Sequence, residues 1–131
     1  EEGQNFDILV MDAFSGDAVP IHLLTKESFT IYLNHLTQDG ILAVHISNLY
    51  INLQPVIAAL ADELGLSYVI VVNGSDNQDI QTSSTWALLS RDQKILNHPA
   101  IQKTIIKPPP KFLFFHLWSD DYSNILGSIK F

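Results

Sequence analysis

FDILVMDAFSGDAVPIHLLT, residues 6–25, is the stretch of the sequence that decides the fold. It opens with an apolar run that ends on Asp12, and such a run predicts a buried strand. A polar loop with Asp17 and His22 follows, and Thr25 can cap a helix that begins after it. A strand that leads through a loop into a helix is typical of an α/β sheet, in which ligands bind outside the carboxyl ends of the strands.

The other elements follow from the spacing of apolar residues. Nearly unbroken apolar runs predict four strands, which cover residues 6–12, 41–47, 67–73 and 84–90. Two helices are expected, one capped by Thr25 that ends at Asp39-Gly40, and one capped by Asn52 that ends at Gly65. Their apolar faces are Phe29, Tyr32, Leu33 and Leu36 in the first, and Leu53, Val56, Ile57, Leu60, Ala61 and Leu64 in the second. Short helical pieces broken at Pro99 are expected over residues 93–102.

The predicted fold class is α/β, with three parallel strands, one antiparallel strand and helices on the faces. Right-handed crossovers through the two helices make the first three strands parallel neighbours. No helical pattern separates the third strand from the fourth, which predicts an antiparallel pair. Asp12, Ser47-Asn48 and Asn73 then fall at the same edge of the sheet.

Composition limits the class of function. The 131 residues form one domain, 47% hydrophobic and 16% charged. No apolar run reaches the roughly 18 residues of a membrane span, and no secretory leader opens the chain. The absence of cysteine fits a cytoplasmic protein and excludes thiolate catalysis. A net charge of −7 disfavours nucleic acid and favours small cationic partners such as amines.

Asp12 and Asp17 are the candidate catalytic residues. Asp12 stands at a strand end, where a carboxylate can act as a general base or hold an ammonium group, or simply cap the loop. Asp17 can close over a ligand with its loop, or bond its own backbone in a turn. His22 can contact a substrate or cap the same loop.

Further polar residues have both a binding and a structural interpretation. Asn48 can bind a ligand or cap the next helix. Asp121 and Tyr122 follow Trp118, so this segment offers a stacking surface with acids, or the start of an acidic helix N-terminus. His45, inside an apolar strand, is expected to be a hydrogen-bonded core histidine. The histidines lack the spacing of metal ligands, so no metal is expected.

Three motifs resemble the spermidine synthase-like family, in particular bacterial members fused to a membrane transporter segment: FDILVMDAFSGDAVPIHLLTKESF, DGILAVHISN and WSDDYSNIL. The resemblance implies a Rossmann-like, AdoMet-dependent methyltransferase fold. It implies that Asp12 is the first acid of an acceptor loop, beside the AdoMet-type donor, and orients or deprotonates the attacking amine. Ser15, His22, Asn48, Asp121 and Tyr122 become substrate-binding candidates.

The chain departs from the family pattern in two ways. Ser15 stands where these transferases have a second acid three residues after the first. The chain also has no G-x-G-x-x-G nucleotide loop, so it resembles the C-terminal half of the fold. We therefore expect a single partial domain over residues 1–131, with an extended tail and a short terminal helix over 105–131. A membrane segment is possible upstream.

The resemblance predicts a transferase fragment that moves an aminopropyl or methyl group from decarboxylated AdoMet or AdoMet to an amine. Alone, the fragment is expected to bind no donor and to be inactive. The alternative is a non-catalytic, degenerate transferase-fold module for association or amine binding. In either case the strand over residues 6–12 would be an exposed edge. It would dimerise, swap elements or be covered by FLFFHLW, residues 112–118.

Overall fold

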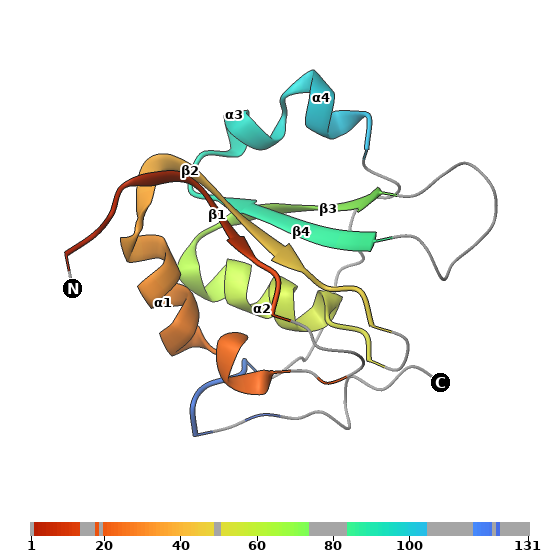
Figure 1. Cartoon of the computed structure of the whole chain (residues 1–131). Coiled ribbons are helices and arrows are strands. Elements are labelled where there is room, and N and C mark those ends of the chain that lie inside the picture. Colours follow the sequence, from red (N-terminus) through yellow and green to blue (C-terminus); the bar gives the residue numbers. More distant parts are fainter. Residues whose placement is uncertain are drawn as a thin grey trace.

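The computed structural model describes residues 2–13, 18, 20–48, 51–73, 84–104, 117–121 and 123. Within them, helices lie on both sides of one four-stranded sheet (Figure 1). The elements in chain order are β1 (Phe6–Met11), the 3-10 turn η1 (Ile21–Leu23), α1 (Lys26–Asn34), β2 (Leu36–His45), α2 (Gln54–Leu64), β3 (Ser67–Asn73), β4 (Ser84–Ser90), α3 (Gln93–Leu96) and α4 (Pro99–Gln102).

The sheet is mixed, and the predicted set of three parallel strands is wrong. Its order is β1-β2-β4-β3, and only β1 and β2 form a parallel pair. The strand β4 lies between β2 and β3 and is antiparallel to both. The predicted antiparallel pairing of β3 with β4 is confirmed, but β4 also uses its second edge to pair with β2. The position next to β2, which was predicted for β3, is therefore occupied by β4.

Three of the strands nevertheless run in the same direction. Since β4 is antiparallel to both β2 and β3, these two point the same way, and β1 is parallel to β2. The carboxyl ends of β1, β2 and β3 and the beginning of β4 consequently lie at one edge of the sheet (Figure 1). We call this the carboxyl edge.

The boundary between α1 and β2 differs from the prediction. The helix ends at Asn34, and Leu36 begins the strand instead of completing the apolar helix face. Gly40 lies inside β2, where a Cβ would come within 3.1 Å of the Phe6 carbonyl oxygen. This glycine allows β1 to approach closely and does not stop the helix. Leu36 is buried, and a buried apolar residue at helical spacing does not by itself distinguish the end of a helix from the start of a strand.

One face of the sheet packs on α1 and α2 and forms the main core. The predicted apolar stripe of α2 is buried except for Leu64, which is half-buried. Asn52 Oδ1 accepts a hydrogen bond from the Gln54 amide at 3.2 Å, and Gly65 ends the helix with a φ of 66°. The core members from the sheet include Met11, Leu42, Val44, Ile70, Ala87 and Leu89. On the other side of the sheet α3 contacts β3 and β4, and α4 begins at Pro99 as predicted.

The described part of the tail packs at the beginning of α1. Trp118 is fully buried in the main core, and its carbonyl oxygen accepts a hydrogen bond from the Lys26 amide at 3.0 Å. Residues 112–116 and most of the predicted terminal helix lie outside the described residues; residues 119–121, at its predicted beginning, form a bridge and a turn instead of a helix. None of the helices in the described ranges has the length and apolarity needed to cross a membrane.

Candidate functional site at the carboxyl edge

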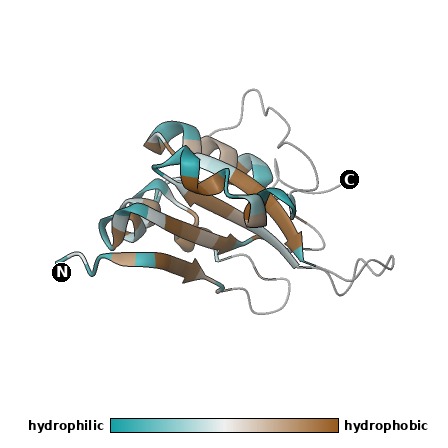
Figure 2. Cartoon of the chain, turned by 90° about the horizontal axis from the view of Figure 1, so that it is seen from above, coloured by the Kyte–Doolittle hydropathy of each residue, from teal (hydrophilic) through white to brown (hydrophobic). Residues whose placement is uncertain are grey.

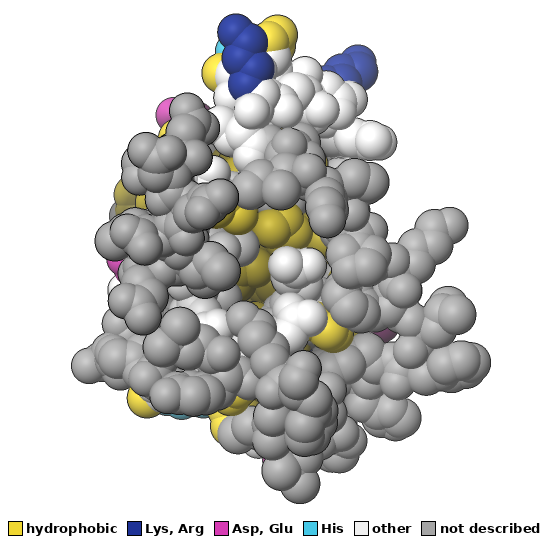
Figure 3. All heavy atoms as spheres, turned by 90° about the vertical axis from the view of Figure 1, so that its right-hand side faces the viewer, with side chains coloured by type: hydrophobic (Ala, Val, Ile, Leu, Met, Phe, Trp, Pro, Cys, Tyr) yellow, Lys and Arg dark blue, Asp and Glu magenta, His cyan; other side chains and the backbone are white. Residues whose placement is uncertain are grey.

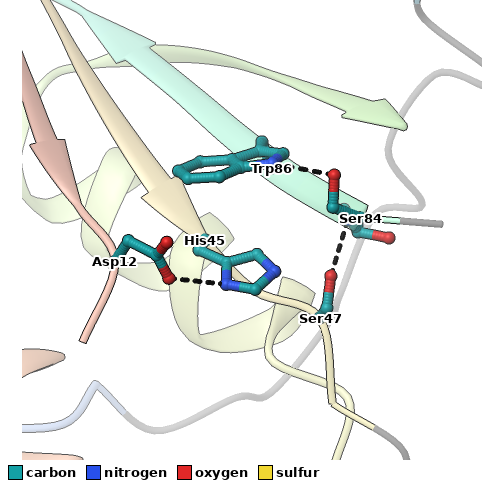
Figure 4. Close-up of polar contacts among 6 residues, drawn as sticks. Asp12, His45, Ser47, Ser84 and Trp86 are labelled. Atoms are coloured by element: carbon teal, nitrogen blue, oxygen red, sulfur yellow. Dashed lines mark hydrogen bonds and ion pairs between the residues drawn. The ribbon is translucent and has the colours of Figure 1, made fainter. Parts of the chain in front are cut away.

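Asp12 follows the last residue of β1 and meets His45, the last residue of β2. Met11 is the register partner of Val44, so the next residue on each strand falls side by side. Asp12 Oδ1 lies 2.8 Å from His45 Nδ1 (Figure 4). An ionised carboxylate only accepts hydrogen bonds, so the ring nitrogen carries the shared hydrogen. The Asp12 side chain is 54% exposed and that of His45 21%, so the pair opens to solvent on the aspartate side.

Trp86 stacks on the His45 ring and restricts its rotation. The two residues are register partners on β2 and β4, and their ring centroids lie 4.8 Å apart with planes at 27°. The indole Nε1 donates to Ser84 Oγ at 3.2 Å, which holds the indole at the edge (Figure 4). The Asp12 carboxylate is thus hydrogen-bonded to the His45 imidazole of β2, which in turn stacks on Trp86 of β4. Such support keeps a polar group in one geometry.

Ser47 and Asn48 have structural bonds in this arrangement. Ser47 Oγ accepts the Thr85 amide at 2.6 Å and joins the end of β2 to β4. Asn48 Oδ1 accepts the Ile51 amide at 2.8 Å, a turn-type bond just before α2. Asn73 ends β3 at the same edge and is exposed. Seen from this side, described hydrophobic side chains are visible near the centre of the face (Figure 3).

The other predicted site residues lie elsewhere or outside the described ranges. His22 is exposed in η1, and its carbonyl oxygen accepts a bond from Ser28 Oγ at the start of α1. Asp121 is exposed in the turn beside Asp120, the acid that bonds Thr25. None of the described contacts of His22 or Asp121 reaches Asp12. Ser15, Asp17 and Tyr122 lie outside the described residues.

His45 and Trp86 are the site residues that sequence reasoning missed. His45 is hydrogen-bonded as expected, but it ends its strand and belongs to the edge and not to the core. Aligning the ends of the predicted strands, 6–12 and 41–47, would pair Asp12 with Ser47, so the sequence did not indicate the observed register that places Asp12 beside His45. Trp86 had no signal either, because the pairing of β4 with β2 is not local in sequence.

Possible metal ligands do not cluster in the described ranges. No group of three or more histidine, aspartate or glutamate side chains there is arranged to hold a metal ion. The sequence matches no family model, and no curated protein or solved structure is significantly similar to the chain.

Proposed function

We propose that Asp12, supported by His45, is the amine-binding residue of a spermidine synthase-like transferase that moves an aminopropyl or methyl group from an AdoMet-type donor to an amine. The observation that carries the proposal is the half-exposed Asp12 carboxylate, 2.8 Å from an imidazole at the carboxyl edge of the sheet. The resemblance of residues 6–48 to that family supports it, and so does the position at strand ends, where α/β sheets bind ligands.

The pair has the chemistry that an amine acceptor needs. Asp12 Oδ1 is held by His45, and Oδ2 has no partner among the described residues, so it can bind a substrate ammonium group. The amine must lose a proton before its nitrogen can attack an electrophilic carbon, because the attack uses the lone pair. Asp12 Oδ2 is the atom placed to accept that proton. The net charge of −7 attracts cationic amines to the protein.

The donor side is not assigned to residues of this chain. The sequence has no G-x-G-x-x-G loop. We therefore expect the chain alone to bind the amine without turnover. The same absence favours a second candidate, a non-catalytic module that binds amines at Asp12. We also propose a cytoplasmic location, which is consistent with the absence of cysteine.

Calorimetric titration of the chain with putrescine, a diamine, tests the proposal. We expect Asp12→Asn to weaken binding by about 10- to 100-fold, the effect of losing one charge-assisted hydrogen bond. Asp7→Asn is the matched control, because Asp7 is an exposed acid on β1 and its substitution changes the net charge equally. We expect His45→Gln to weaken binding less than Asp12→Asn, since the carboxylate remains but loses its fixed orientation.

The outcomes separate the possibilities. Equal losses in Asp12→Asn and Asp7→Asn would show that only the overall charge attracts the amine, and the proposed site would be wrong. Putrescine binding that survives Asp12→Asn would place the amine elsewhere. Both candidates predict that this chain alone gives no transfer from decarboxylated AdoMet. Transfer by the chain would therefore contradict the expected lack of turnover and would exclude the non-catalytic module.

A further inference from the structure

β1 is an edge strand whose outward side chains are apolar and exposed. It lies at the end of the described sheet, next to β2. Phe6 is 45% exposed, Ile8 61% and Val10 58%. We call these three residues the β1 strip. Exposed apolar side chains on an edge strand are a known liability for a soluble protein, since the edge also has unpaired backbone groups.

The β1 strip lies on the sheet face that is turned away from α1 and α2. Leu9 and Met11, which alternate with the strip, pack on the core formed with those helices. On the strip side α3 contacts β3 and β4, the far half of the sheet. Figure 2 shows β1 as a hydrophobic strand at the border of the described sheet. Of the predicted covering segment, residues 112–118, only 117 and 118 are described; Trp118 packs at the beginning of α1, and the β1 strip is exposed.

This edge has both unpaired backbone groups and exposed apolar side chains, and a second strand is a partner that fits both. The Phe6 amide donates to the His35 carbonyl oxygen at 2.8 Å and so points toward β2. Backbone groups alternate along a strand, so the amides of Asp7 and Leu9 point to the free side. Those amides require backbone carbonyls, and the β1 strip requires apolar neighbours on the same face. An extended apolar strand supplies both.

We propose that β1 pairs antiparallel with β1 of a second copy of this chain, about a two-fold axis. With Ile8 at the axis, Ile8 faces its own equivalent and Phe6 faces Val10 of the second copy, so the two strips join on one face. Asp7 is the only charged residue of β1, and in this register it faces Leu9. No like charges are opposite each other. The proposal does not depend on the amine site.

Charge supports a second copy over a basic or acidic partner strand. β1 has no basic residue and a single acid, so it offers no charge pattern for a different strand to recognise. Two copies of a chain with a net charge of −7 repel each other. Since salt screens that repulsion, the dimer should become tighter as ionic strength rises. Association through ion pairs would respond in the opposite direction.

Sedimentation of the chain over a wide concentration range tests the proposal. We expect a monomer–dimer equilibrium that Ile8→Lys and Val10→Lys each weaken by about tenfold or more, because lysine on an edge strand opposes pairing. Ile31→Lys is the matched control: Ile31 is 58% exposed on α1 and outside the strip, so this variant should dimerise like the parent chain. Circular dichroism checks that all variants fold.

Two results would overturn the proposal. One is a chain that stays monomeric at the highest concentration and salt tested. The other is a dimer that both strip variants leave intact, whether or not Ile31→Lys weakens it. Hydrogen exchange at the Leu9 amide gives a second readout independent of variants. We expect its protection to increase with protein concentration, and equal exchange in monomer and dimer would exclude pairing through β1.

Discussion

The Thr25 side chain joins the beginning of α1 to the distant tail segment. The side chain is buried, and Oγ1 accepts a hydrogen bond from the Ser28 amide at 3.3 Å. The same hydroxyl donates to Asp120 Oδ1 at 2.8 Å, while the Asp120 amide donates to Glu27 Oε2 at 3.0 Å. One hydroxyl thus caps a helix and holds the turn that follows the buried Trp118.

We expect Thr25→Ala to lower the free energy of unfolding by about 1–2 kcal/mol, the range for loss of an N-cap, and to reach its upper end because the Asp120 contact is lost too. Urea denaturation measures the change. Thr30→Ala is the control, since Thr30 is exposed and donates only to the Lys26 carbonyl oxygen, and should change stability by about 0.5 kcal/mol or less. Equal losses in the two variants would contradict the double role of Thr25.

For individual residues, a contact could be predicted from the sequence only when the partner residue lies close by in the sequence. The cap at Thr25 was predictable because its acceptor bond goes to Ser28, three residues ahead. Asp12 was predictable as a strand-end acid. Its partner His45 was not, because their contact depends on the register of two strands separated by a helix.

Among the elements, α2 follows a local rule at its end but not at its beginning, where the N-cap is Leu53, without a side-chain cap bond, instead of the predicted Asn52. It ends at Gly65, whose φ of 66° lies in the left-handed region that favours glycine. A Cβ at this position would meet nothing within 4 Å, so substitution has a conformational cost and no steric one. Helix α2 was accordingly predicted well from sequence, with its stripe and its stop.

We expect Gly65→Ala to lower the free energy of unfolding by about 1 kcal/mol, the cost of a left-handed conformation for alanine. Gly65→Asn should have a smaller effect, because asparagine adopts that conformation more readily. Thermal and urea unfolding of the two variants measure the difference. An alanine variant as stable as the asparagine variant would mean that the helix end rearranges to avoid the positive φ.

The arrangement of strands in the whole molecule was the part that local patterns could not predict. The sequence correctly indicated four strands and the antiparallel pairing of β3 with β4. It did not indicate that β4 would pair with β2, because residues 41–45 find their partners at 86–90. Apolar runs identify buried strands but not their neighbours, so the predicted three-strand parallel set failed while the shared carboxyl edge was still formed.

The stability of the whole molecule should fall at high pH. Among the described residues, three groups have a pKa raised in the folded state: Lys26, chiefly by its hydrogen bond with Glu63, and Tyr32 and Tyr68, chiefly by burial. A raised pKa means that the folded chain keeps these protons when the unfolded chain has released them. Their contribution is present below the ordinary values of 10.5 and 10.0 and is lost as the pH rises through the folded pKa values.

We therefore expect the free energy of unfolding, measured with urea at a series of pH values, to decrease above about pH 10. Tyr68→Phe removes one of the three groups and should make the decrease shallower, while leaving the aromatic ring in place against the core. Tyr32→Phe is a less clean comparison, because it also removes the bond that the Tyr32 hydroxyl donates to the Leu23 carbonyl oxygen at 3.2 Å. A decrease equally steep in Tyr68→Phe would show that burial of this phenol does not contribute to the alkaline loss of stability.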